Sequence, residues 1–406
     1  MPTSKVSDTR HTQRCKPSFD TVVVLVCDSV GCGGAPDAAR FGDQGSNTLG
    51  HVIERARPAL PNLASLGLDR IPGVPALCAA SAPTAAFGRM VETAPAKDTM
   101  TGHWELMGLV AEGTLPTYPQ GFPAAIIRAF EKAVGRRVLG NRAASGTAIL
   151  RELGAEHIET GALIVYTSAD SVFQVAAHEE VVPPQELYEI CLQARALLHG
   201  EHAVGRVIAR PFTGDAADNF RRTAHRRDFS LPPPGSTVLD RLVGAGRTTY
   251  GVGKIHDIFA GMGLSGYVKT ASNADGVAET CRALREGLAE VVITNLVDFD
   301  SLYGHRNDVN GYATALCELD LALPELLATL ARGDCLMITA DHGCDPTFPG
   351  TDHTRECVPL LVVGEAVKPV ALGTRSTYAD LGRTILENFA IEASIPGTSF
   401  LDQITG

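Results

Sequence analysis

The stretch A-D-H-G-C-D-P-T-F-P-G-T-D-H, which runs from Ala340 to His353, indicates both the fold and the chemistry of this chain. It follows C-L-M-I-T (Cys335–Thr339), a short apolar run that is typical of a buried strand. Asp341 and His342 would therefore emerge at the carboxyl end of a strand, where open α/β sheets bind their ligands. An Asp-His pair with a further histidine, His353, beyond a rigid loop predicts a metal site. The competing interpretation is a capping aspartate with two surface histidines.

The composition is that of an ordinary globular protein, and it limits the partners. The chain has 406 residues, of which 45% are hydrophobic and 20% are charged, so we expect two to three domains of roughly 150 residues each. The net charge of −11 indicates no nucleic-acid or membrane partner, although a phosphorylated substrate stays possible because a local metal outweighs the global field. No apolar run approaches the ~20 residues of a membrane span.

The cysteines and the N-terminus indicate the compartment. Ten cysteines are scattered without C-x-x-C pairs, which is typical of reduced thiols in a cytoplasmic protein. Residues 1–18 are polar and lack the apolar region of a secretory signal, so we predict a disordered N-terminal extension.

Apolar runs that alternate with helical patterns predict an α/β core. The run T-V-V-V-L-V (Thr21–Val26) predicts a strand buried on both faces, and it ends just before Asp28. A dinucleotide-binding loop is the alternative for the G-C-G-G turn that follows, but the third glycine is missing. The run V-V-I-T-N-L (Val291–Leu296) predicts a second strand, and it leads to Asp300 and His305.

The middle of the chain is predicted to form an inserted domain. Proline- and glycine-dense segments at Pro116–Pro123 and near Pro234 are typical of domain boundaries. Between them, helical patterns at 124–134 and 184–198 and an apolar strand at 162–166 predict a smaller α/β domain. The predicted domains are residues 19–114 and 235–406 for the core and residues 115–234 for the inserted domain.

Two features are candidates for binding phosphate. The segment A-K-D-T-M-T-G-H-W-E predicts a helix that Asp98 and Thr99 would cap, with the Thr99 hydroxyl against free backbone N–H groups that favour an anion. An ordinary capped helix is the alternative. The second feature is the densest positive charge in the chain, which is either a phosphate-binding cluster or a solvated surface. It comprises Arg221, Arg222, Arg226 and Arg227.

Aspartate and histidine residues beyond the predicted strands form one candidate set of metal ligands. Three aspartates and three histidines favour Zn²⁺ or Mn²⁺ over Ca²⁺, and six ligands predict two ions ~3.5–4 Å apart. One metal would lower the pKa of the Thr99 hydroxyl, and both would screen the charge of a phosphoryl group. The six residues are Asp28, Asp300, His305, Asp341, His342 and His353.

Six motifs occur together: D-S-V-G-C-G, A-K-D-T-M-T-G-H-W-E, Y-T-S-A-D-S-V-F-Q, N-L-V-D-F-D-S-L-Y-G-H-R-N-D-V, A-D-H-G-C-D-P-T and G-T-D-H-T-R-E. In combination they resemble the phosphopentomutase family of the alkaline phosphatase superfamily, from about Phe19 to the C-terminus. The resemblance implies an alkaline-phosphatase-like core, with a mostly parallel sheet flanked by helices, interrupted by a cap domain. His225 and Cys357 depart from the family pattern, and neither is a proposed metal ligand.

The resemblance also implies roles for particular residues. The six metal ligands would bind two Mn²⁺ ions, and Thr99 would carry the phosphoryl group. The residues implied to hold the sugar phosphate are Ser168, Asp170, Arg222, Arg226 and Lys254.

The implied activity is that of an isomerase, an intramolecular phosphotransferase that interconverts α-D-ribose 1-phosphate, or its 2-deoxy form, and the 5-phosphate. A phosphorylated Thr99 would give a sugar 1,5-bisphosphate intermediate, a sugar bisphosphate would prime the enzyme, and the cap would close to exclude water. We expect a monomer whose partner is a small phosphorylated pentose. The alternatives are a metal-dependent phosphatase or phosphonate hydrolase that uses the same site, and a metal-binding protein without activity.

Overall fold

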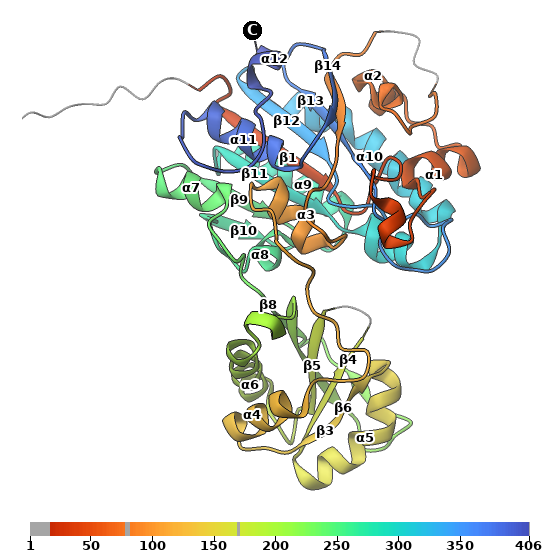
Figure 1. The fold of residues 1–406 in the computed structure, drawn as a ribbon, viewed down its shortest axis with the longest axis vertical. Coiled ribbons are helices and arrows are strands. Elements are labelled where there is room, and N and C mark those ends of the chain that lie inside the picture. The colour runs from red at the N-terminus through yellow and green to blue at the C-terminus, as the bar shows by residue number, and fades with distance from the viewer. Residues whose placement is uncertain (1–16, 78–81, 169–170, 406) are drawn as a thin grey trace, which may run out of the picture.

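The computed structural model describes residues 17–77, 82–168 and 171–405, which form two lobes (Figure 1). Most of the predicted N-terminal extension, and Asp170 of the predicted sugar site, lie outside the described residues. The chain passes from the larger core lobe to the second lobe after α3 (Thr99–Leu106) and returns before α7 (Val238–Gly244).

An eight-stranded sheet organises the core lobe, in the order β10-β9-β11-β1-β12-β13-β2-β14. Only β13 runs against the others, because it pairs antiparallel with both β12 and β2 while the remaining pairs are parallel. The strands are β1 (Thr21–Cys27), β2 (Ala86–Met90), β9 (Thr249–Val252), β10 (Gly266–Val268), β11 (Val291–Leu296), β12 (Asp334–Thr339), β13 (Val358–Val363) and β14 (Ala371–Arg375).

Strand β1 lies in the centre of this sheet, as its continuous apolar run predicts. Val24 lies opposite Ile293 of β11 and Met337 of β12, and all three side chains are at most 2% exposed. The carboxyl ends of β9, β11, β1, β12 and β2 consequently meet at one edge of the sheet, which is where parallel sheets place their sites. The predicted α/β fold with a mostly parallel sheet is confirmed.

Two groups of helices flank the sheet (Figure 1). In the first group α10 packs against α1, α2 and α9, and in the second α11 packs against α3, α7 and α12. Within the described residues, no helix combines the length and the apolar character that crossing a membrane requires. The remaining helices of this lobe are η1 (Ala38–Phe41), α1 (Thr48–Ala56), α2 (Pro61–Leu66), η2 (Leu68–Arg70), α8 (Ile255–Ile258), α9 (Asn273–Arg285), η4 (Phe299–Tyr303), η5 (Gly304–Arg306), α10 (Val309–Thr329), α11 (Ala379–Asn388) and α12 (Leu401–Thr405).

The second lobe, called the cap below, is a smaller α/β unit on a six-stranded sheet in the order β3-β4-β5-β6-β7, with β8 also paired to β6. Apolar side chains fill both faces of the sheet and form two clusters. The elements are α4 (Ala124–Val134), β3 (Val138–Ala143), α5 (Gly146–Thr160), β4 (Leu163–Thr167), β5 (Val172–His178), α6 (Pro184–Leu197), η3 (Gly200–His202), β6 (Arg206–Thr213), β7 (Arg221–Arg222) and β8 (Arg227–Ser230).

Candidate active site

The six predicted metal ligands all lie at the carboxyl edge of the core sheet. Asp28 directly follows β1, and the Asp341-His342 pair follows β12. Beyond β11, Asp300 lies in the single π-helical turn η4, and His305 lies in η5. His353 lies in the loop between β12 and the antiparallel β13, whose amino end is at the same edge of the sheet.

These side chains form two overlapping groups that share His342. Asp28, Asp341 and His342 form the first group, in which His342 Nε2 lies 3.5 Å from the Asp28 Oδ1 atom and 3.4 Å from the Asp341 Oδ2 atom.

Asp300 with His342 and His353 forms the second group. The two Asp300 oxygens lie 3.3 Å from the Nε2 atoms of His353 and His305. Cys344 offers a thiol as a further ligand near Asp300 and His305, and the sequence-based ligand set did not include it.

Three carboxylate oxygens of the cluster fit bound cations. Asp28 Oδ1, Asp300 Oδ1 and Asp341 Oδ2 are buried and accept no hydrogen bond from the residues that the structure describes, although each lies 3.1–3.5 Å from an imidazole nitrogen. Buried carboxylate oxygens are costly when they lack a partner, and divalent metal ions would satisfy all three.

The three imidazole rings are oriented as metal ligands. Nδ1 of His305 donates to the Thr351 carbonyl at 2.7 Å, and Nδ1 of His353 donates to the Lys97 carbonyl at 2.9 Å. Nδ1 of His342 donates to the carbonyl of Gly343 at 3.1 Å. Because each Nδ1 carries the donated proton, each Nε2 can direct a lone pair into the cluster, as in metal sites whose ligands are oriented by backbone carbonyls.

The pKa values of the cluster reflect its crowded charges. Burial, with the neighbouring Asp341 carboxylate, raises the pKa of Asp28 to about 7. A hydrogen bond to Asp300 raises the pKa of His305 to about 11. Burial disfavours the charged form of His353, but the Asp300 carboxylate outweighs burial and raises its pKa to about 9.

Thr99 lies beside the cluster, but its hydroxyl does not cap α3 as the sequence suggested. Asp98 alone is the N-cap, and its carboxylate accepts from the backbone N–H groups of Met100 and Thr101 at 3.0 and 3.1 Å. Thr99 is the first residue of the helix, and its Oγ1 lies 3.1 Å from Nε2 of His342. The hydroxyl is therefore placed next to the candidate metal ligands.

Two buried polar residues that were not predicted from the sequence, His103 and Asn295, contact the aspartates of the cluster. His103 Nδ1 lies 3.1 Å from Asp341 Oδ2 and 2.8 Å from the Thr99 carbonyl. Asn295 Nδ2 donates to Asp28 Oδ2 at 3.0 Å and lies 3.3 Å from His103 Nε2. The available signal for Asn295 was a polar residue next to the last position of the mostly apolar β11.

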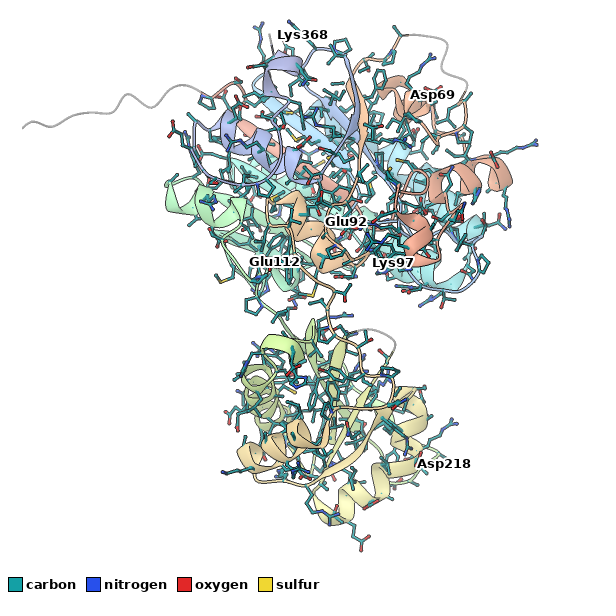
Figure 2. The ribbon with its side chains drawn as sticks, viewed as in Figure 1. Asp69, Glu92, Lys97, Glu112, Asp218 and Lys368 are labelled. Carbon is teal, nitrogen blue, oxygen red and sulfur yellow. The ribbon has the colours of Figure 1, made fainter. Side chains whose placement is uncertain are left out.

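A pocket of about 630 Å³ lies between the lobes and reaches the cluster. Figure 2 shows Lys97, one of its lining residues, on the side of the core lobe that faces the cap. The core contributes Thr99, Lys97, Lys254, Asp300, His305 and His353, and the cap contributes Ser171, Arg206, Arg226 and Arg227.

The residues predicted to hold the sugar phosphate occupy different positions. Lys254 and Arg226 line the pocket, and Lys254 Nζ lies 3.8 Å from Asp28 Oδ2. Arg222 and Ser168 are not among the residues that line it. Arg222 lies on the exposed two-residue strand β7, where its guanidinium approaches Tyr166.

The chain matches the Metalloenzyme superfamily over residues 20–393. The phosphopentomutase of Caldanaerobacter subterraneus subsp. tengcongensis is 57% identical over 386 residues, which cover 94% of this chain and 98% of the relative. That of Carboxydothermus hydrogenoformans is 54% identical over 94% of this chain and 99% of its own. The solved PH0037 protein of Pyrococcus horikoshii aligns with 93% of this chain and 100% of its own at 14% identity, but its TM-score of 0.49 supports no functional inference. At these identities and coverages, the chain belongs to the phosphopentomutase family of the Metalloenzyme superfamily.

Proposed function

We propose that this isomerase interconverts the 1-phosphate and the 5-phosphate of α-D-ribose or 2-deoxyribose through a phosphorylated Thr99. The observation that carries the proposal is the position of the Thr99 hydroxyl, 3.1 Å from His342 Nε2 at the wall of a pocket that both lobes line. The relatives named phosphopentomutase support the class of reaction.

The first half-reaction transfers a phosphoryl group from Thr99 to the free hydroxyl of a bound pentose phosphate. The bond between Thr99 Oγ1 and phosphorus breaks as the bond between the sugar oxygen and phosphorus forms, and the proton of the sugar hydroxyl passes to Thr99 Oγ1. The resulting sugar 1,5-bisphosphate returns its other phosphoryl group to Thr99. A sugar bisphosphate is also the proposed activator, because it can transfer a phosphoryl group to an unphosphorylated Thr99.

Two Mn²⁺ ions are the metals we propose, held by the six clustered aspartates and histidines. When bound, they would lower the pKa of the Thr99 hydroxyl and offset the charge of the phosphoryl group. The backbone carbonyls that accept from the histidine Nδ1 atoms fix the ring orientations that this binding needs.

Positive side chains around the pocket would orient the sugar phosphate. Lys254 approaches from the core, and Arg226 approaches from the cap, where Asp228 holds its guanidinium through bonds of 2.8 and 2.7 Å. Closure of the cap over the bound sugar would exclude water, which would otherwise take the phosphoryl group.

The test is an assay that starts from pentose 1-phosphate and measures two products separately, the pentose 5-phosphate and free phosphate. The wild-type enzyme should form mainly the 5-phosphate, whereas Thr99→Ala should lose activity by on the order of 10³-fold or more, since a nucleophile is removed. The metal content of Thr99→Ala should equal that of the wild-type enzyme.

Thr314→Ala is the matched control, because the hydroxyl of this exposed threonine on α10 donates to the Asn310 carbonyl at 2.9 Å, away from the candidate site. It should leave turnover unchanged. Release of mostly free phosphate by the wild-type enzyme would contradict the mutase in favour of a phosphatase, and full activity of Thr99→Ala would remove Thr99 as the nucleophile.

A further inference from the structure

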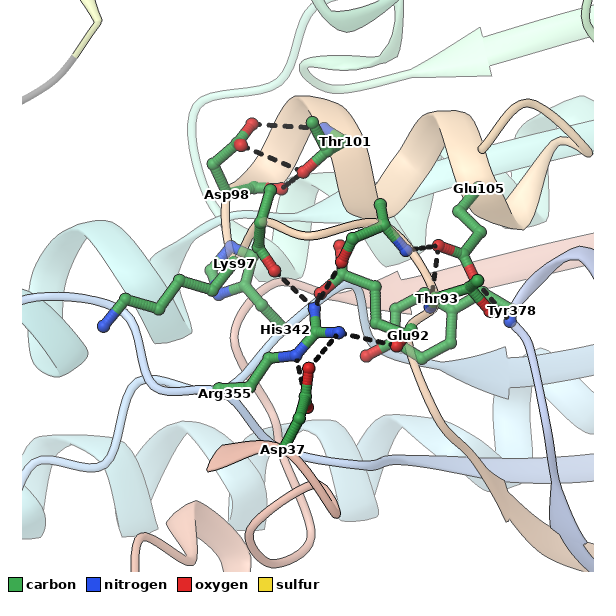
Figure 3. Close-up of polar contacts among 12 residues, drawn as sticks. Asp37, Glu92, Thr93, Lys97, Asp98, Thr101, Glu105, His342, Arg355 and Tyr378 are labelled. Atoms are coloured by element: carbon green, nitrogen blue, oxygen red, sulfur yellow. Dashed lines mark hydrogen bonds and ion pairs between the residues drawn. The ribbon is translucent and has the colours of Figure 1, made fainter. Parts of the chain in front are cut away.

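Residues 92–98 connect β2 to α3 and set the position of Thr99. One buried side chain, that of Arg355, bonds to three backbone carbonyls of this segment. The Arg355 guanidinium donates to the carbonyls of Glu92 at 2.7 Å and Ala94 at 2.8 Å, and it also donates to that of Ala96 (Figure 3). The Arg355 side chain is only 2% exposed. Three alternate carbonyls of the segment are therefore fixed by one rigid, planar group.

Arg355 is itself held in place by two carboxylates. Its Nε and Nη2 atoms donate to the two Asp37 oxygens at 3.0 and 3.2 Å, and Nη1 donates to Glu92 Oε2 at 2.5 Å. A buried guanidinium without such partners would be strongly destabilising. The paired carboxylates leave the guanidinium little freedom to move, so the carbonyls bonded to it are held as well.

A second buried charge holds the same segment from its N–H side. The Glu105 carboxylate accepts from the backbone N–H of Thr93 at 2.8 Å and from that of Ala94 at 2.7 Å. Glu105 lies on α3, the helix that begins at Thr99. The segment and the helix are therefore bonded to each other. Arg355 connects them to the rest of the core, and so does Glu105, which also accepts from Thr377 Oγ1 at 2.7 Å and from the Tyr378 backbone N–H at 3.1 Å (Figure 3).

Side chains next to Arg355 in the chain point in two opposite directions. His353 and Arg355 both point toward the 92–98 segment, since His353 Nδ1 donates to the Lys97 carbonyl at 2.9 Å. Glu356 points the other way and accepts from the Thr48 backbone N–H at 2.9 Å. One extended stretch thus carries a candidate metal ligand and holds the segment that ends at the nucleophile.

We propose that Arg355 is a positioning residue that fixes the Thr99 hydroxyl relative to the metal-binding cluster. The inference rests on the proposed function, in which Thr99 accepts the phosphoryl group. Arg355 is not among the residues that line the pocket, so its loss should leave sugar binding intact. A displacement of about 1 Å at the reacting atoms is sufficient to slow transfer by about 100-fold.

The experiment compares Arg355→Lys and Arg355→Met with Arg375→Met in the metal-loaded full-length enzyme. Both Arg355 variants should lower kcat by about 10- to 100-fold with KM within about twofold, and Arg355→Lys should retain more activity because a charge remains. Phosphorylation of Thr99 by a pentose 1,5-bisphosphate, followed by mass spectrometry in a single turnover, should slow in parallel. Bound metal, measured by mass spectrometry of the elements, should be unchanged.

Arg375 is the matched control, because it is also an arginine with a mostly buried side chain and a carboxylate partner. It bonds to Asp380 at 2.5 Å and to the Thr398 carbonyl at 2.9 Å, and its side chain does not bond to the 92–98 segment. Arg375→Met should lower the melting temperature without changing kcat at temperatures where the protein is folded. An equal loss of kcat in this control would reduce Arg355 to a general stabilising role and overturn the proposal.

Two other outcomes overturn the proposal: a kcat of both Arg355 variants within twofold of wild type, or loss of bound metal in step with activity. If neither variant folds, Glu92→Gln decides, since it removes the ion pair that holds the Arg355 guanidinium against the segment. A threefold or greater fall in its kcat supports the positioning role, and a smaller fall refutes it. A wild-type enzyme that never carries phosphate on Thr99 would overturn the proposed function itself, and the inference with it.

Discussion

At the scale of single residues, His103 is positioned to orient Asp341, one of the candidate metal ligands. Its Nδ1 lies 3.1 Å from Asp341 Oδ2, and its ring is 1% exposed. Partners that orient a ligand in this way typically contribute 10- to 100-fold to metal affinity. His103→Leu should therefore weaken Mn²⁺ binding by about 10- to 100-fold, measured by isothermal titration calorimetry of the metal-free protein.

His157 provides a control for the loss of a buried imidazole. It lies in the cap, where Nδ1 donates to the Ala162 carbonyl at 2.6 Å and Nε2 accepts from the His178 backbone N–H at 2.8 Å. His157→Leu should lower stability but leave the affinity for Mn²⁺ unchanged. An affinity of His103→Leu within twofold of wild type would show that Asp341 needs no such support.

The sequence was sufficient to identify the six clustered residues but not the groups that orient them. Asp28 and Asp341 could be predicted to meet because each follows an apolar run that forms a neighbouring parallel strand. His103 could not be assigned in the same way, because its contact with Asp341 depends on how α3 packs across the sheet edge. The position of the Thr99 hydroxyl was predicted wrongly for a local reason, since the Asp98 carboxylate satisfies the helix N-terminus and leaves Thr99 directed toward His342.

At the scale of elements, strand β1 is the one whose packing the candidate site depends on most directly. It lies between β11 and β12, and Asp28 follows it. Leu25 is fully buried, so Leu25→Ala should lower the free energy of unfolding by about 2–5 kcal/mol through lost burial and a residual cavity. Urea denaturation followed by fluorescence of Trp104, the only tryptophan, would measure this, because Trp104 is buried in the core lobe.

The matching control is Leu321→Ala on α10, where the leucine is 76% exposed. Its effect should stay within about 0.5 kcal/mol, as expected for a surface substitution. Equal effects of the two substitutions would contradict the central placement of β1.

The elements that could be predicted from the sequence are those buried on both faces. The apolar runs at 21–26, 291–296 and 335–339 correspond to β1, β11 and β12. Strand β14 was not predicted, because it is a partly exposed edge strand with a register shift near Gly373. Strand β7 is two exposed arginines, and such edges carry no continuous apolar pattern to detect.

At the scale of the whole molecule, the pocket exists only because two lobes meet. The core contributes the candidate nucleophile and the candidate metal ligands, whereas the cap contributes the three arginines that line the pocket within the described part of the chain. Which of the four clustered arginines reaches the pocket depends on how the cap sits on the core, so the sequence left this question open. Arg226 and Arg227 line the pocket, whereas Arg221 and Arg222 do not appear among its lining residues.

This division of the arginines can be tested by comparing Arg226→Ala with Arg221→Ala. If Arg226 contacts the sugar phosphate, its removal should raise KM by about 10- to 100-fold, because a hydrogen bond between charged groups contributes about 1.5–3 kcal/mol. The fraction of phosphoryl groups lost as free phosphate should rise as well, since a weakly held cap admits water. Arg221→Ala removes an equal charge from the same cluster and should change neither quantity. Equal increases in KM would mean that the arginines act only as a diffuse positive field, and no increase for Arg226→Ala would place the sugar phosphate elsewhere in the pocket.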